Sequence, residues 1–538
     1  MNLYVGLAVA TVAGIASHLG YFKHGEHHMY GTKYIQGFLV VFATYITYGV
    51  IYCQEESSLV VSRFLSFSAC YFGGLYASLL WYRIYFSPLQ HFPGPFAAKI
   101  SRLWFSAKIR KLDAFRKVHE LHEKYGDFVR IGPTDLSTIH PKAVQAIYAF
   151  GAPCRKGAWY DLLLPHMSLQ LFRDRASHDA SRRIWAPAFK ENALRGYKER
   201  LESHQERLID YISFRAGTNV NISKLFMLYS FDVMGDLGYG KSFGMLDSSE
   251  YHWSIQLLKK GVRPPGLMLP EWLWRVMIAI PKLSDDWWNF LDYSKATLHE
   301  RMRAEKAAPD IVSFLLEPIK DRKPSPQEML LLEGDSQLII IAGSDTTAAT
   351  LIHVIYELIR NPKYVEVLRS ELAPYLATSQ SLSYEDLLRL ERLDSVIYEV
   401  LRLHPVVPTN LQRMTPPEGL KIGDTFIPGN TNIFCPQYAM GRNENVYPQA
   451  SSFIPERWTS RPELVKERSA FAPFSTGPSS CAGRPLALLN LRTTLIRILQ
   501  RFDFEFAPGE SGHRVEEDGV DHFTFEPGAC EVVFRERS

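Results

Sequence analysis

Cys481 is the side chain in this sequence that is best placed to do chemistry. It lies in the stretch FSTGPSSCAG, from Phe474 to Gly483, where its near neighbours are small residues or proline. A helical pattern begins at about Leu486, so loop amides and the helix N-terminus are expected to stabilise a thiolate. Such a thiolate could be a catalytic nucleophile or a metal ligand. The bare loop would also let a large flat cofactor approach the backbone.

A second polar group, AGSDTT from Ala342 to Thr347, interrupts an apolar helical pattern that runs from Glu328 to Arg360. Glycine weakens a helix interior, and short hydroxyl and carboxyl side chains compete there for backbone hydrogen bonds. One interpretation is a polar patch on a solvated helix face. The other is a buried site, in which Asp345 and the hydroxyl of Thr346 form the pairing that proton delivery needs.

A third group pairs an acid with a base in the helical stretch EVLR. Glu399 and Arg402 are three residues apart and share one helix face. An exposed pair of this kind would add little stability. If Arg457 of the later stretch PERW joins them, a bidentate arrangement would lock a core instead.

Helices dominate the elements that must position these residues. Helical spacing is found over residues 116–125, 179–189, 195–214, 222–237, 328–360, 364–376, 384–403 and 486–501. Strand patterns are short and cover residues 128–131, 420–422, 426–427 and 530–534. The predicted fold class is therefore mainly α with a minor β part, preceded by N-terminal transmembrane helices.

The N-terminal part of the chain is predicted to be a membrane anchor over residues 1–86. Three apolar segments, residues 3–21, 34–53 and 64–81, are each near the ~20 residues that a membrane helix needs. The alternative is that one of them, the first above all, is a hydrophobic hairpin partner or an interfacial helix. The proline-rich stretch SPLQHFPGPF, residues 87–96, is a stiff connector, and residues 97–538 form one large unit.

Charge and composition limit the function classes. The chain of 538 residues is 46% hydrophobic with a formal net charge of +3 and no basic stripe, which argues against nucleic-acid binding. The six cysteines have no paired short spacing, so a disulfide framework or a zinc site is not expected. Lys23, Lys33 and Arg83 place the first connection and everything after the third span in the cytosol, with the N-terminus lumenal.

Four motifs in a fixed order carry a resemblance. The order AGSDTT, EVLR, PERW and FSTGPSSCAG is similar to the signature set of the cytochrome P-450 family, and the anchor with its proline connector is similar to the microsomal members. The run from Tyr438 to Trp458 resembles fungal members. The resemblance implies the cytochrome P-450 fold and a haem b cofactor in residues 97–538.

Site residues follow from the resemblance by position. Cys481 matches the thiolate that binds the haem iron, and Asp345 with Thr346 matches the acid-alcohol pair of the distal helix. Glu399, Arg402 and Arg457 match a structural triad. The remaining matches are to residues that contact the haem or admit oxygen: Ala342, Gly343, His178, Arg182, Arg413, Phe474, Gly477 and Gly483.

One position departs from the family pattern. Two residues before the cysteine the family usually has an arginine that pairs with a haem propionate, and Ser479 stands there in this chain. We therefore expect Arg413, Arg182 and His178 to bind the propionates, with Ser479 at most a neutral donor.

The function implied is a monooxygenase that inserts one oxygen atom into an apolar small molecule, in fungal secondary metabolism. No glycine-rich dinucleotide motif follows a strand, so electrons are expected from NADPH through a separate reductase.

The apolar and aromatic members of residues 159–169 and 406–411 are candidates for the substrate pocket, or for ordinary core: Trp159, Tyr160, Leu162, Leu163, Leu164, Met167, Leu169, Val406, Val407, Pro408 and Leu411. The expected location is the endoplasmic reticulum membrane, in contact with lipid. Two alternatives stay open: an oxygen-independent haem-thiolate isomerase or dehydratase, and a non-catalytic membrane haem-binding protein.

Overall fold

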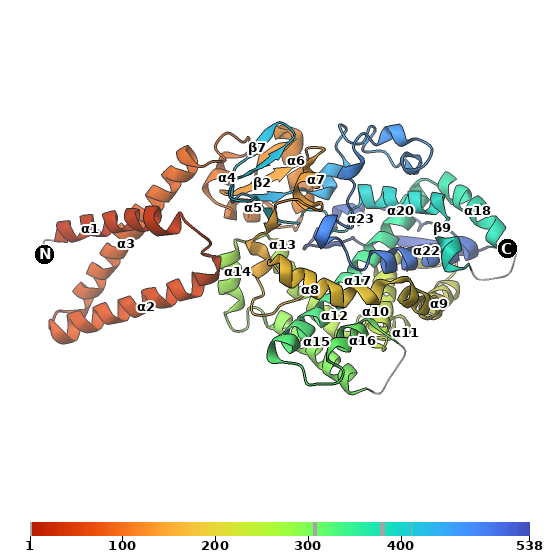
Figure 1. The fold of residues 1–538 in the computed structure, drawn as a ribbon, viewed down its shortest axis with the longest axis horizontal. Coiled ribbons are helices and arrows are strands. Elements are labelled where there is room, and N and C mark those ends of the chain that lie inside the picture. Colours follow the sequence, from red (N-terminus) through yellow and green to blue (C-terminus); the bar gives the residue numbers. More distant parts are fainter. Residues whose placement is uncertain (1–2, 305–308, 377–381, 410, 538) are drawn as a thin grey trace.

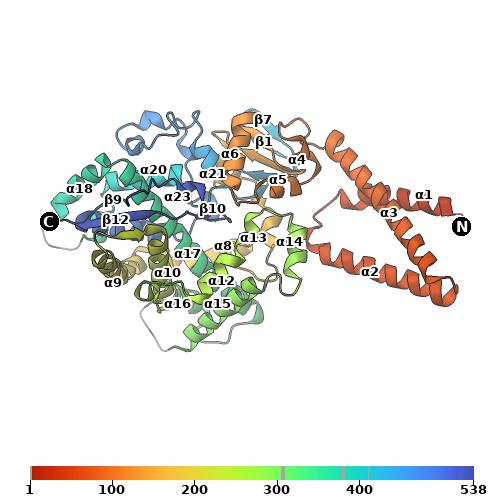
Figure 2. The same cartoon turned by 180° about the vertical axis from the view of Figure 1, so that it is seen from behind.

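Three long helices project from a large body that holds all the other elements (Figure 1). The computed structural model describes residues 3–304, 309–376, 382–409 and 411–537. The N-terminus lies near the tip of the projecting helices, and the C-terminus lies on the opposite side of the body, as the reverse view also shows (Figure 2).

The projecting helices match the three predicted spans. They are α1 (Leu3–Ser17), α2 (Gly31–Thr47) and α3 (Ser57–Trp81), and each continues into a short π-helical turn. The segments Leu3–Phe22, His28–Tyr52 and Ser57–Phe86 are long and apolar enough to cross a membrane. The third helix begins before residue 64, the predicted start of its span.

Glycines let α1 and α3 cross closely. A Cβ atom on Gly14 would lie 2.0 Å from the carbonyl oxygen of Tyr71, and one on Gly74 would lie 2.2 Å from that of Thr11. Small residues of this kind allow membrane helices to pack backbone to backbone. The first connection, residues 23–30, lies at the body, and the second, residues 53–56, lies at the far tip (Figure 1).

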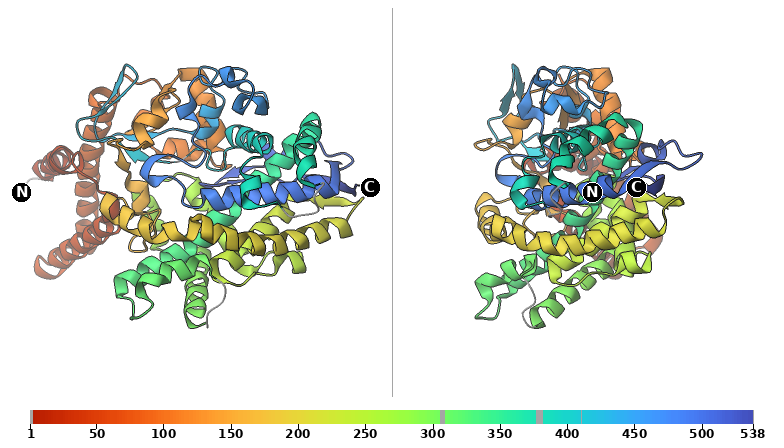
Figure 3. Two further views of the ribbon diagram at one scale, coloured as in Figure 1. Left: turned by 45° about the vertical axis from the view of Figure 1, so that its right-hand side comes forward. Right: turned by 90° about the vertical axis from the view of Figure 1, so that its right-hand side faces the viewer.

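A long helix, α17 (Pro326–Arg360), runs through the centre of the body. It too is apolar enough to cross a membrane, but 72% of its most apolar window is buried inside the molecule, so it is a core helix. The hydroxyl of Ser325 and the carboxylate of Glu328 form a capping box at its start. Helices from earlier and later in the chain surround it (Figure 3).

The larger helices of the body besides α17 are α6 (Ala114–Tyr125), α8 (Arg175–Trp185), α9 (Glu191–Phe214), α10 (Ile222–Tyr239), α12 (Trp253–Gly261), α14 (Glu271–Ile278), α15 (Asp285–Arg303), α18 (Lys363–Leu376), α20 (Glu391–Leu403) and α22 (Arg484–Arg501). The shorter helices are α4 (Phe96–Ile100), α5 (Leu103–Lys108), α7 (Ala143–Tyr148), α11 (Met245–Ser248), α13 (Arg263–Gly266), α16 (Ile311–Leu316), α19 (Tyr384–Leu387), α21 (Gln437–Gly441) and α23 (Arg514–Glu517).

The strands form small sheets beside the helices. One sheet has the order β1 (Phe128–Arg130), β2 (Asp135–Thr138), β8 (Asn432–Phe434), β5 (Arg413–Met414) and β3 (Arg155–Lys156). A second has the order β4 (Asn219–Asn221), β12 (Glu531–Glu536) and β9 (Phe502–Phe506). Two hairpins complete the set: β6 (Leu420–Ile422) with β7 (Thr425–Ile427), and β10 (Val520–Asp521) with β11 (Phe525–Glu526).

The prediction of a mainly α fold with minor β is confirmed, with differences in detail. The predicted helix over residues 384–403 is broken between α19 and α20. Strands β2, β3, β4, β5, β8, β9, β10 and β11 were not predicted. Of these, β2, β5 and β8 are short and fully buried and therefore lack the alternating pattern of a half-buried strand.

Candidate active site

The loop around Cys481 is held by its own backbone. The amide of Cys481 donates to the carbonyl of Phe474 at 2.8 Å. Gly477 has φ +67°, and a Cβ atom there would lie 2.2 Å from the carbonyl oxygen of Tyr148 at the end of α7. Glycine at this position therefore lets the loop pack against the body, whereas a Cβ atom on Gly483 would meet nothing closer than 3.8 Å.

The Cys481 side chain lies in an enclosed space. The residue has exposed surface, yet burial is the largest influence on the pKa of its thiol, which it raises. The amides of Gly483 and Arg484 and the charge of Arg182 lower that pKa, as expected for a helix start, but burial outweighs them. The exposed surface of Cys481 therefore faces an internal space and not bulk solvent.

Two buried cations lie side by side on paired strands. Lys156 of β3 is opposite Arg413 of β5. The guanidinium of Arg413 donates to the hydroxyl of Tyr160 at 2.9 Å, and the ammonium of Lys156 donates to the carbonyl of Gln170 at 2.6 Å. Burial and the charge of Arg413 lower the pKa of Lys156 to about 7. Within the described part of the chain, no carboxylate forms an ion pair with either cation.

Helix α8 adds two further basic residues. Arg182 donates to the carbonyl of Ser480 at 2.9 Å, which places it against the cysteine loop. His178 is buried, and its Nδ1 lies 3.1 Å from Oδ1 of Asp179. Burial is the main cause of the lowered pKa of His178, and the positive charges of Lys156 and Arg182 lower it further. These three basic groups are therefore close enough to interact electrostatically.

In α17, Ala342 is exposed although most of the surrounding helix is buried. The hydroxyl of Thr346 donates to the carbonyl of Ala342 at 2.9 Å, and Thr346 is itself partly exposed. Ala342 and Thr346 are one helical turn apart and so share a face. Gly343 is explained by packing, since a Cβ atom there would lie 2.5 Å from the Met234 side chain of α10.

Asp345 is buried, which rules out the interpretation of a fully solvated motif. Burial raises the pKa of its carboxyl to about 7, with the charge of Glu526 raising it and that of Lys259 lowering it. Lys259 of α12 and Glu526 of β11 form an ion pair at 2.5 Å. Sequence reasoning did not identify either residue, because only the fold brings them near α17.

The predicted acid-base triad is assembled. The guanidinium of Arg402 binds the carboxylate of Glu399 through two hydrogen bonds of 2.9 and 2.7 Å, and Nε of Arg457 donates to the same carboxylate at 3.0 Å. All three side chains have 0% exposure. The indole of Trp458 and the amide of Ile454 also donate to Glu399, so both carboxylate oxygens accept several hydrogen bonds.

A protein family explains this combination of residues. The family model described as "Cytochrome P450" matches residues 93–533. The chain belongs to the cytochrome P450 family. This P450 is 42% identical over 528 residues to the Cytochrome P450 monooxygenase notG' of Aspergillus versicolor, covering 98% of this chain and 97% of that one.

A second relative is the Tryprostatin B 6-hydroxylase of Neosartorya fischeri, 42% identical over 543 residues, with 99% of this chain and 98% of the relative covered. The crystal structure of the cytochrome P450DA heme domain matches with a TM-score of 0.67 at 18% identity, covering 79% of this chain and 94% of that one. The P450 fold is thus confirmed, and the relatives identify the protein as an oxidoreductase, a P450 monooxygenase.

The residues of this chain fit the haem that the family implies, whose iron a cysteine thiolate binds. Cys481 offers a thiol that faces an internal space. Arg413 and Lys156 are buried cations whose charge no described carboxylate balances, and haem brings two propionates. Sequence reasoning missed Lys156, because its place beside Arg413 depends on the pairing of β3 with β5.

Proposed function

We propose that this P450 inserts one oxygen atom from dioxygen into an apolar small molecule of fungal secondary metabolism. The observation that carries the proposal is the open Cys481 thiol on an enclosed space, in a chain that also holds a buried carboxyl, Asp345, on its central helix. The relatives' names make tryprostatin B the first compound to try.

In the proposed site Cys481 binds the haem iron, and the haem supplies oxygen activation when bound. Arg413, Lys156, Arg182 and His178 are the propionate-binding set; Lys156 thus provides a charge that Ser479 cannot. Phe474, Gly477 and Gly483 would shape the loop that holds the haem, and Ala342 and Gly343 would belong to the helix on its oxygen-binding side. The roles of Phe474, Gly343 and Gly483 rest on the family pattern alone.

Proton delivery is assigned to Asp345 and Thr346. A carboxyl with a pKa of about 7 is close to half protonated near neutral pH, so it can both take up and release a proton. The partly exposed hydroxyl of Thr346, in the next position along α17, is able to hold that proton at the open face of the helix.

The membrane arrangement is also a proposal. Residues 1–86 form the anchor, residues 87–96 the connector and residues 97–538 the haem-binding catalytic domain, in the endoplasmic reticulum membrane. The contact of the first connection with the body supports a cytosolic first connection and body with a lumenal N-terminus. A separate NADPH-dependent reductase is the proposed electron donor.

Membranes containing this P450 and a microsomal reductase test the proposal. They are supplied with NADPH and a panel of apolar metabolites that includes tryprostatin B, with Cys481→Ala membranes as the control. The expected result is a product heavier by one oxygen atom that the control lacks. Product formation that needs neither NADPH nor dioxygen would favour the isomerase or dehydratase alternative instead.

A further inference from the structure

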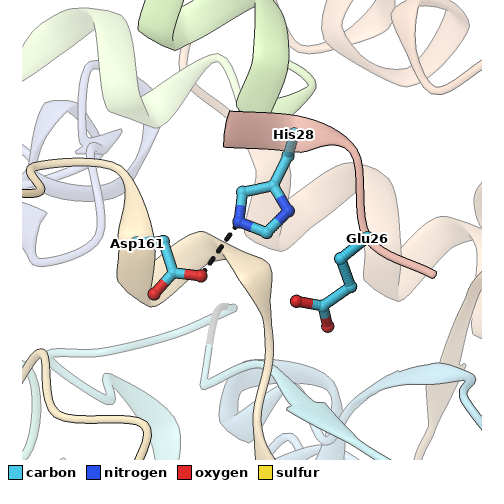
Figure 4. A group of neighbouring side chains, drawn as sticks. All are labelled: Glu26, His28 and Asp161. Carbon is cyan, nitrogen blue, oxygen red and sulfur yellow. Dashed lines mark hydrogen bonds and ion pairs between the residues drawn. The ribbon is translucent and has the colours of Figure 1, made fainter. Parts of the chain in front are cut away.

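The loop that joins the first two membrane helices reaches into the body. This anchor loop, residues 23–30, carries Glu26 and His28, and both lie beside Asp161 of the body (Figure 4). Nε2 of His28 lies 2.9 Å from Oδ2 of Asp161. The side chains of His28 and Asp161 are only 10% and 14% exposed, so the contact is largely shielded from solvent.

Arg173 ties the same residues together. Its guanidinium donates to both carboxylate oxygens of Glu26, at 2.8 and 2.7 Å, and also to Asp161. Its Nε donates to the backbone carbonyl of Lys156 at 3.1 Å. One arginine therefore connects the anchor loop to both ends of the segment 156–173.

Helix α14 holds this segment from another side. Nη1 of Arg275 donates to the carbonyls of Asp161 and Leu164, at 3.1 and 2.9 Å. The start of α2 packs on the same helix, where a Cβ atom on Gly31 would lie 3.2 Å from the carbonyl oxygen of Trp272. The anchor thus meets the body through both α14 and the polar contacts of Glu26 and His28.

These contacts are an ion-pair network and not a metal site. Glu26, His28 and Asp161 have potential ligand atoms within 4.8 Å of one another. The guanidinium of Arg173 binds both carboxylates, and that of Arg155 lies 3.9 Å from Glu26, so two guanidinium groups offset the two carboxylates without a metal ion.

We propose that the anchor loop is a positioning element for segment 156–173, so that Glu26 and His28 hold one wall of the substrate pocket from outside the body. Asp161 directly follows Tyr160, whose hydroxyl accepts a hydrogen bond from Arg413. Any displacement of Asp161 would therefore move a residue that contacts the proposed propionate-binding set. The inference rests on the proposed function in that segment 156–173 borders the substrate.

The test compares two haem ligands in membranes that contain the full-length holoenzyme. Phenylimidazole fills part of the pocket, whereas imidazole needs little more than the iron; both shift the haem absorption band. Glu26→Gln is expected to weaken the binding of phenylimidazole about fivefold and that of imidazole much less. The magnitude follows because partly exposed ion pairs contribute up to ~1 kcal/mol. Glu55→Gln, which breaks the ion pair of Glu55 with Arg63 at the far end of the anchor, is the matched control.

A double-mutant cycle tests whether Glu26 acts through Arg173, its partner in the body. If Glu26 acts through Arg173, the variant with both Glu26→Gln and Arg173→Gln binds phenylimidazole no more weakly than Arg173→Gln alone. Additive losses, or a Glu26→Gln variant that behaves like Glu55→Gln, would overturn the inference. A wild-type protein without the carbon monoxide spectrum of a thiolate-bound haem would instead contradict the proposed function, so the two failures are distinguishable.

Discussion

Asp345 and Lys156 both have pKa values of about 7, and burial is the main cause for each. Burial disfavours the charged form of any group, so it raises the pKa of an acid and lowers that of a base. Asp345 thereby becomes able to exchange protons near neutral pH. Lys156 remains available to gain its charge when an anion such as a propionate is placed beside it.

The raised pKa of Asp345 predicts how stability varies with pH. The folded protein holds this proton more tightly than the unfolded chain, so the contribution is fully present below about pH 4 and is lost as pH rises through about 7. Asp345→Asn should therefore gain stability relative to the wild type between about pH 6 and about pH 8, by ~1 kcal/mol. Thermal unfolding at both pH values measures this, with the exposed Asp321→Asn as control. A constant difference across this range would contradict the assignment.

Thr346 should matter for coupling, because its hydroxyl lies on the open face of α17. In Thr346→Ala we expect product formed per NADPH to fall roughly tenfold, with the missing electrons appearing as hydrogen peroxide. Thr350→Ala is the matched control: Thr350 is buried, and its hydroxyl also donates to a carbonyl one turn earlier, at 2.8 Å. Equal losses in both variants would point to helix packing and away from proton delivery.

Haem retention should depend on the buried cations and not on Ser479. Arg413→Met and Lys156→Met should each weaken haem binding by about tenfold or more, the value of one charge-assisted hydrogen bond. The ratio of haem to protein after gel filtration measures the effect. If Ser479→Ala removed the haem from the protein while Arg413→Met left the haem content unchanged, the assignment of the propionate-binding residues would be wrong.

At the scale of elements, Glu399 connects α20 to the chain that follows it. Its carboxylate accepts hydrogen bonds from Arg402 in α20 and from Ile454, Arg457 and Trp458 further along. The guanidinium of Arg402 also donates to the carbonyl of Ala450 at 2.6 Å. One buried carboxylate thus organises an irregular segment that has little regular secondary structure to hold it.

Removing that charge should unfold this part of the protein. Glu399→Gln leaves Arg402 and Arg457 buried without their counter-charge, which costs about 3–5 kcal/mol. We expect little folded, haem-containing protein, measured as the yield of haem-bound protein in membranes. Glu391→Gln, an exposed position in the first turn of α20, is the control and should behave as wild type.

For the whole molecule, the contact between the anchor loop and the body restricts the membrane topology. The contacts of Glu26 and His28 with the body support the proposed topology, in which the first connection and the body share one side of the bilayer. In that proposed topology, with three spans, the second connection at residues 53–56 lies on the other side, together with the N-terminus.

Glycosylation measures this arrangement directly. An Asn-X-Thr acceptor inserted in the second connection should receive a glycan, whereas the same acceptor inserted in the first connection should not. An endoglycosidase-sensitive shift on a gel reports the modification. A glycan on the first connection would contradict both the orientation and the contact of Glu26 with Arg173.

The sequence by itself determined the class of the protein, its three apolar spans and most of the proposed site. Those inferences depended on short-range patterns: helical spacing around Asp345 and Glu399, and a run of small residues around Cys481. Such patterns can be read from the sequence because helix periodicity and loop composition involve residues that are close together along the chain.

Only the tertiary structure decided which distant charges meet. Lys156 lies beside Arg413 because β3 pairs with β5, and Lys259 and Glu526 act on Asp345 because α12 and β11 pack near α17. The contact of Glu26 with Arg173 likewise joins the anchor to the body. Burial is the main cause of the shifted pKa values of Asp345 and Lys156, and it depends on the folded chain. The size of these pKa shifts therefore could not be predicted from the neighbouring residues in the sequence.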